Sequence, residues 1–214
     1  MDGLRLADRI AYGGGMAARK AGVICDAYRA IDGSCPLVSA RRIVRLGVLS
    51  IPAGGGIRSP AGFGVPFRQL VLDQAYVLAG DYLVGPGGTY LVATNEAPAP
   101  ALGVQCNEVI TLWRTATPAV PGLNPYGAVL LSDARVVLAG FPAALTPGGV
   151  SDRTRLGLPD DTKLPGYVAV VAAVDGAGPL VADILRDGRG RQFVVDAAAR
   201  FGGVWRLALT ESVA

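Results

Sequence analysis

Two stretches of the chain repeat one arrangement of apolar and polar positions. Residues 80–92 read GDYLVGPGGTYLV, and residues 182–195 read ADILRDGRGRQFVV. Each has a small residue, an aspartate, two apolar residues, a glycine-rich turn and a second apolar run. Two apolar runs around such a turn are typical of a β-hairpin. After a loop, each copy leads to an apolar segment with a tryptophan, at 108–114 and 203–210. The pattern therefore predicts a β unit that is used twice.

Other apolar runs predict further strands. They are short, carry many β-branched residues and end at turn residues, and they lie at 22–30, 41–51, 105–115, 134–145 and 167–174. In the second half they recur at short intervals, as in a compact antiparallel barrel or sandwich of about five strands. We expect a mainly β fold of antiparallel β-barrel or sandwich units with a short N-terminal α-helix. The pattern fits one continuous sandwich as well as two barrels.

The N-terminal segment has helical spacing. Apolar residues in 4–21 predict two short amphipathic helical pieces, and the run Gly13–Gly15 is expected to break or bend them. Each glycine costs roughly 1 kcal/mol against alanine inside a helix. Three prolines in 117–127 indicate a linker. The expected organisation is a helical segment at 1–21, a first β unit at 22–116 with a long Gly/Pro loop at 52–64, the linker at 117–127, and a C-terminal β-barrel unit at 128–214.

An aspartate stands at the entry of each hairpin. We expect Asp81 and Asp183 to accept backbone hydrogen bonds there, as aspartates do in turns, and this role needs no catalysis. Trp113 and Trp205 are expected to anchor the core, since an indole combines a large apolar face with one N–H donor. Docking at the surface is the alternative for the tryptophans. The repeated motif therefore indicates scaffold.

Composition adds the expectation of an assembly. Of the 214 residues, 51% are hydrophobic and only 17% are charged. Monomers rarely expose large apolar patches, so we expect an obligate assembly that hides much of this surface between subunits. The net charge of +3 gives no broad nucleic-acid footprint.

The cysteines and the N-terminus indicate the compartment. Three scattered cysteines, Cys25, Cys35 and Cys106, are not a disulfide framework of the secreted type. Free thiols in a reducing compartment are expected, with a Cys25–Cys35 bridge as the alternative. The N-terminus shows no apolar signal-peptide region, and no apolar run reaches the ~20 residues that span a bilayer. We expect synthesis in a cytoplasm and no membrane partner.

Residues that support catalysis are scarce. The chain has no histidine, which removes Ser-His-Asp and Cys-His catalysis and the common His-based metal sites. It has no CxxC pair and no GxxxxGK[ST] phosphate loop. A carboxylate pair for glycosidase chemistry remains by elimination, from Asp152, Asp160, Asp161 and Asp175. The first three are also a Ca²⁺ candidate, but they lack a recognisable loop spacing and fit a solvated loop. We therefore expect no catalytic, cofactor-binding or metal site.

Several segments carry a family resemblance. They are LADRI, GGGMAARKAGVICDAYRA, GDYLVGPGGTYLVATNEAPAPALGVQCNEVITLWR, LPGYVAVVAAV and ADILRDGRGRQFVVDAAARFGGVWRLALT. Together they resemble small virion proteins of tailed bacteriophages and prophages, which are encoded among head, neck and tail morphogenesis genes. The last segment is similar to the β-barrel pattern of head–tail connector proteins of the stopper type. Inserts at 52–64 and 146–166 depart from a minimal connector. The resemblance implies a ring-forming, non-enzymatic protein.

These observations predict a structural protein of a tailed-phage virion, part of a ring in the neck or head–tail connector. It would be located in the virion and assembled in the host cytoplasm. Expected partners are copies of itself, other phage neck and tail proteins, and packaged DNA in the lumen. Subunit packing and strand-edge pairing would hold the ring together. The expected assembly contacts are Ile57, Arg58, Phe63 and Phe67, and the expected DNA-facing residues are Arg186, Arg189 and Arg191.

Two alternatives belong to other classes. A tail-tip, baseplate or fibre-attachment protein would dock other virion proteins or the host surface, and loop aromatics such as Phe63, Phe67 and Tyr126 would favour it. An enzyme such as a cell-wall hydrolase is the third class, and the absence of histidine argues against it. For the arginine-rich segment 186–191, a solvated hairpin tip is the alternative to a phosphate contact.

Overall fold

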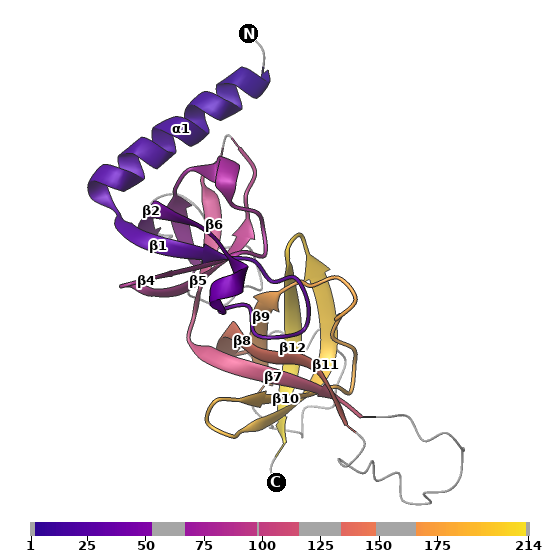
Figure 1. Cartoon of the computed structure of the whole chain (residues 1–214). Coiled ribbons are helices and arrows are strands. Elements are labelled where there is room, and N and C mark those ends of the chain that lie inside the picture. The colour runs from indigo at the N-terminus through magenta and orange to yellow at the C-terminus, as the bar shows by residue number, and fades with distance from the viewer. Residues whose placement is uncertain (1–2, 53–66, 98, 116–133, 149–165, 213–214) are drawn as a thin grey trace, which may run out of the picture.

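The chain folds into a helix followed by two closed β-barrels (Figure 1). The computed structural model describes residues 3–52, 67–97, 99–115, 134–148 and 166–212. In these ranges, the α-helix α1 (Gly3–Ala21) precedes two antiparallel sheets, each of which closes with six strands. The expected mainly β fold is confirmed, and the two hairpins lie in two barrels rather than in one sandwich.

Both barrels have the same strand order. The strands of barrel 1 are β1 (Val23–Tyr28), β2 (Arg42–Pro52), β3 (Phe67–Val71), β4 (Tyr82–Gly85), β5 (Gly88–Thr94) and β6 (Ala101–Cys106), with short 3-10 turns η1 (Ser39–Arg41) and η2 (Gln74–Tyr76). The strands of barrel 2 are β7 (Glu108–Arg114), β8 (Arg135–Pro147), β9 (Gly166–Ala172), β10 (Ile184–Asp187), β11 (Gln192–Phe201) and β12 (Val204–Ser212). Around the barrels the orders are β1-β2-β3-β6-β5-β4 and β7-β8-β9-β12-β11-β10. Each strand of barrel 1 therefore has a counterpart six strands later.

The register repeats as well. Leu83 of β4 pairs with Ala27 of β1, and its counterpart Leu185 of β10 pairs with Leu112 of β7. In both hairpins a bulge interrupts the second strand where it pairs with the last strand of the barrel. The repeat seen in the sequence is thus one part of a duplicated barrel.

The barrels share a core at their junction. Barrel 1 has its own interior cluster, whereas its outer face joins the larger core that fills barrel 2. Tyr82 is fully buried at this junction. Its hydroxyl donates to the carbonyl oxygen of Pro142 at 2.9 Å and accepts from the N–H of Ala172 at 3.3 Å. Burial raises the pKa of Tyr82 well above its usual value. One buried side chain thus links a hairpin of barrel 1 to two strands of barrel 2.

A single residue, Asn107, separates β6 from β7. Its side-chain amide donates to the carbonyl oxygen of Leu145 at 2.8 Å and accepts from the Leu145 N–H at 2.7 Å. The first β unit therefore ends at Cys106 rather than at residue 116 as expected, because β7 pairs with β8 and β10. The expected linker 117–127 lies outside the described residues.

Helix α1 is continuous through its three glycines, so the expectation of two broken pieces is wrong. The reason is close packing on barrel 1. A Cβ on Gly14 would lie 2.9 Å from the carbonyl oxygen of Leu72, and one on Gly15 would lie 2.9 Å from the Cβ of Asp73. The helix needs glycine here to approach the barrel, and this packing offsets the low helix propensity.

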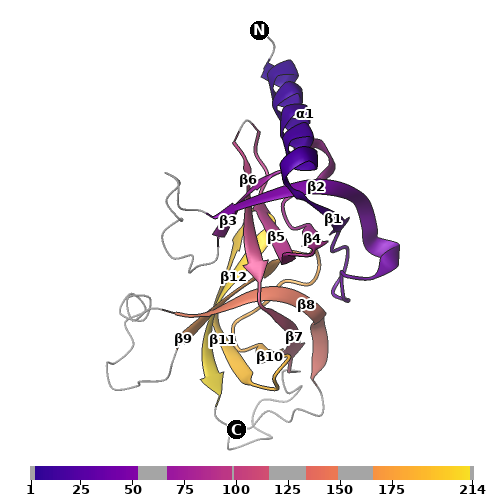
Figure 2. The same cartoon turned by 90° about the vertical axis from the view of Figure 1, so that its left-hand side faces the viewer.

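The molecule has two distinct ends. In both views, α1 and the N-terminus lie at one end, and barrel 2 and the C-terminus lie at the other (Figures 1 and 2). Both tryptophans belong to barrel 2. Trp205 packs partly buried against the shared core, but Trp113 is half-buried and lies outside that cluster. The anchoring role is therefore supported for Trp205 alone.

Candidate functional site

The aspartate at the entry of the first hairpin holds an arginine as well as the backbone. Asp81 is 2% exposed. Its carboxylate accepts the N–H of Leu78 at 2.8 Å, as expected from the sequence. It also accepts Nε and Nη2 of Arg29, at 2.8 and 2.7 Å. This bidentate hydrogen bond raises the pKa of Arg29. The pair fastens the end of β1 to the start of β4.

Barrel 2 repeats this arrangement. Asp183, also 2% exposed, accepts the N–H of Leu180 at 2.7 Å. Arg114 donates Nε and Nη2 to its two carboxylate oxygens, both at 2.8 Å. We call each aspartate–arginine pair a latch. Both latches are structural, because their charged groups are engaged with one another. The arginines were missed from the sequence, although an arginine follows an aromatic residue at the end of both strands, in Tyr28-Arg29 and Trp113-Arg114.

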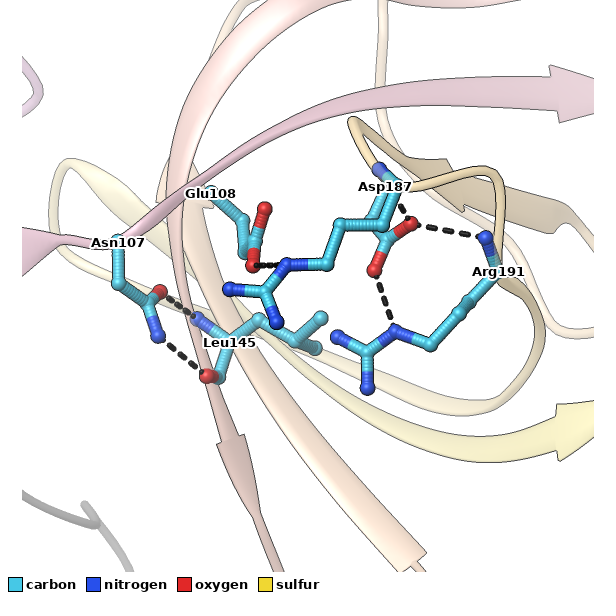
Figure 3. A network of polar contacts seen from close by, with 6 residues as sticks. Asn107, Glu108, Leu145, Asp187 and Arg191 are labelled. Carbon is cyan, nitrogen blue, oxygen red and sulfur yellow. Dashed lines mark hydrogen bonds and ion pairs between the residues drawn. The ribbon is translucent and has the colours of Figure 1, made fainter.

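The second hairpin tip forms a separate polar network around Asp187 (Figure 3). The Asp187 carboxylate accepts the backbone N–H groups of Arg189 and Arg191, at 3.0 and 2.9 Å, and Nε of Arg191 at 2.7 Å. The Arg191 guanidinium also lies over the rings of Tyr167 and Phe193, 5.7 and 5.3 Å from their centroids. The tip is therefore held from inside the barrel.

This network decides how the predicted DNA-facing arginines are placed. Arg191 is committed to Asp187, and Arg189 makes an ion pair with Glu108 at 2.9 Å while remaining 71% exposed. Arg186 is exposed on β10. The structure thus gives two of the three arginines, Arg189 and Arg191, an acidic partner within the barrel.

A cleft of about 410 Å³ lies beside this tip, at the junction of the barrels. Its lining includes Cys106, Asn107, Glu108 and Arg189. Burial raises the pKa of Cys106 to about 12, so the thiolate that a nucleophile requires is disfavoured. Glu108 is paired with Arg189, and Asn107 is bonded to β8. Cys106, Asn107 and Glu108 therefore do not form a pair of nucleophile and base in this cleft.

The other candidates for chemistry are dispersed. Across the described ranges, no three His, Cys, Asp or Glu side chains are grouped so that they could hold a metal ion. Asp175 is exposed and pairs with Arg200. The remaining carboxylates considered from the sequence, Asp152, Asp160 and Asp161, lie outside the described residues. Cys25, Cys35 and Cys106 are free thiols.

The expected assembly contacts need one correction. Phe67 is 4% exposed and belongs to the core that the two barrels share, so its side chain is not exposed to a neighbouring subunit. Ile57, Arg58 and Phe63, together with Tyr126, lie outside the described residues. Strand-edge pairing also needs revision. Both sheets close on themselves, so the described strands include no edge strand to pair with another chain.

Helix α1 presents the best candidate surface. Among the α1 residues whose side chains the structure describes, those buried toward barrel 1 are all small, namely Ala11, Gly15 and Ala18. Four of its large apolar side chains, Leu6, Ile10, Tyr12 and Met16, are each more than a third exposed, and Tyr12 and Met16 also line a hollow against barrel 1. A surface helix normally does the reverse and buries its large apolar residues. The helical spacing of the sequence could not show which face of α1 the barrel covers.

Comparisons with known proteins give no relative. None of the helices in the described part of the chain has the length and apolar character needed to cross a membrane. No protein-family model matches the chain, and neither a curated protein nor a solved structure matches it significantly.

Proposed function

We propose that this chain is a non-enzymatic structural protein of a tailed-phage virion, and that it forms part of a ring in the neck or head–tail connector. The phage assignment rests on the resemblance of its sequence segments to small virion proteins. The ring-forming role rests on the surface of the fold. Its expected partners are other copies of the chain and neighbouring neck and tail proteins.

One observation carries the assembly role. The helix α1 exposes Leu6, Ile10, Tyr12 and Met16 while it packs on barrel 1 through alanine and glycine. Exposed apolar side chains gathered on one element mark a site where another molecule binds. Because α1 lies at the end of the molecule away from barrel 2, it is accessible to a neighbour (Figure 2).

The interior of the fold supports a scaffold rather than a catalyst. The buried carboxylates Asp81, Asp183 and Asp187 each hold an arginine. The barrels are joined through a shared core and through Asn107, which gives a stiff unit for building an assembly. Subunits would associate by packing of faces, since the described strands of the two barrels include no edge strand.

The mass and symmetry of the purified full chain test this proposal. We expect light scattering coupled to gel filtration to give a multiple of the 21.9 kDa monomer, and negative-stain electron microscopy to show closed rings. A trimer would instead support a fibre or tail-tip attachment protein. A chain that stays monomeric at high concentration would overturn the ring.

A further inference from the structure

The interface between the two barrels of one chain uses a defined row of side chains. Tyr82, Leu91, Val104 and Phe67 are cross-strand partners in turn, on β4, β5, β6 and β3. All four are less than 5% exposed and belong to the core that barrel 1 shares with barrel 2. We call them the barrel 1 row.

Barrel 2 repeats three of these four positions because the register repeats, and the counterpart of Phe67 is Gly166. Ile184 pairs with Val194, and Val194 pairs with Thr210, on β10, β11 and β12. Trp113 of β7 extends this barrel 2 row, since it pairs with Ile184. All four side chains are only partly buried, and none belongs to the shared core. Barrel 2 therefore covers this face of barrel 1, whereas no barrel covers the equivalent face of barrel 2.

The receiving side of the interface also repeats. Barrel 2 receives barrel 1 on β8, where Pro142 accepts the Tyr82 hydroxyl. By register, Pro142 corresponds to Gly47 of β2. A Cβ on Gly47 would lie 2.9 Å from the carbonyl carbon of Ala18, so α1 covers this position. Helix α1 thus covers barrel 1 at the same position of the fold at which barrel 1 covers barrel 2.

We propose that the exposed side of α1 docks on the barrel 2 row of a second copy of this chain, in a head-to-tail interface. This rests on the ring proposed above and specifies which surfaces make it. The apolar partners are Leu6 and Ile10, one helical turn apart, and the half-buried Ile184 and Val194. Because the two surfaces differ, the interface is heterologous and continues from copy to copy until the ring closes.

Charge favours this pairing over one between two α1 helices. Helix α1 carries Arg5, Arg9, Arg19 and Lys20 against Asp8 alone, so two such helices repel. Barrel 2 places Asp196 beside its row, at a point where barrel 1 has the buried Ala93. The two surfaces also lie at opposite ends of the molecule (Figure 1).

Complementation between two blocked variants tests the interface. Ile10→Asp places a charge on the helix side, and Val194→Asp places one on the barrel 2 side. We expect each to weaken self-association by about tenfold or more, because a charge would be buried without a partner. Mixed together, the two should form a dimer and nothing larger, since only the helix of Val194→Asp and the barrel of Ile10→Asp remain competent. Sedimentation velocity on the full-length chains measures both effects.

Controls separate docking from folding. Ile51→Asp makes the same substitution at a site 38% exposed, against 37% for Ile10, and should leave assembly intact. Asp196→Arg blocks the barrel side at an exposed position if Val194→Asp lowers the unfolding temperature. Closed rings that persist in both blocked variants, or a mixture that stays monomeric, would overturn the interface and leave the ring standing. If the wild-type chain forms open-ended polymers and the variants do not, the interface stands and the closed ring is refuted. If the wild-type chain is monomeric, both the interface and the ring are overturned.

Discussion

Neutralising the carboxylate of the second latch should destabilise the fold although it removes no atom from the packing. The substitution Asp183→Asn keeps the shape of a side chain that is 2% exposed. The wild-type carboxylate accepts two arginine N–H groups and one backbone N–H. An asparagine oxygen can keep the Leu180 N–H and one bond to Arg114, but the amide NH₂ then faces the other N–H of Arg114, donor against donor.

The size of the effect follows from these contacts. A lost hydrogen bond to a charged group is worth about 1.5–3 kcal/mol, and breaking a buried ion pair from one side costs about 3–5 kcal/mol. The Arg114 side chain is 22% exposed, so water solvates part of the charge that the substitution leaves unpaired. We therefore expect Asp183→Asn to lower the free energy of unfolding by about 3 kcal/mol. For a chain of this size, that corresponds to a fall in melting temperature of about 6–12 °C.

Urea unfolding followed by tryptophan fluorescence suits this measurement, because Trp113 and Trp205 both lie in barrel 2. The control is Asp175→Asn, which weakens an ion pair of an aspartate whose side chain is 93% exposed and should change stability by less than about 1 kcal/mol. Equal small losses for the two variants would refute the view that the latch holds barrel 2 together.

Two further predictions concern the backbone and the thiols. Ala182 has φ +69° where barrel 1 has Gly80 at φ +97°, so Ala182→Gly should stabilise the chain by about 1 kcal/mol in urea unfolding. Gly80→Ala should destabilise it, because the added Cβ would lie 2.8 Å from a backbone oxygen of barrel 2. A loss of stability in Ala182→Gly or a gain of stability in Gly80→Ala would contradict this reasoning. Burial raises the pKa of Cys25, and that of Cys106 to about 12, so mass spectrometry after iodoacetamide treatment at pH 8 should find Cys35 labelled first and all three labelled in urea. The same raised pKa values stabilise the fold below about pH 9, and this contribution should disappear as the pH rises toward 12.

Local patterns predicted the parts of the fold that local physics determines. The hairpins, the mainly β class and the capping role of Asp81 and Asp183 depend on turn residues and on alternation over a few positions. The latch arginines escaped prediction because they lie 52 and 69 residues away from their partners. The barrel boundary escaped because the apolar pattern of β7 is the same whichever barrel it joins.

The helix shows a different limit of sequence reasoning. Its glycines weaken an isolated helix, and the pattern alone predicts a break there. The close approach of Gly14 and Gly15 to the strand that ends near Leu72 makes these residues necessary, but this is a property of the neighbouring barrel. For the same reason, the exposure of Leu6 and Ile10 could not be read from their spacing.

The one-residue junction at Asn107 has a mechanical consequence. With no slack between β6 and β7, and with the Asn107 side chain bonded to the main chain of Leu145, the two barrels have no hinge to bend about. A torque applied at α1 would therefore be transmitted to barrel 2, and the two barrels would rotate together as one body rather than independently.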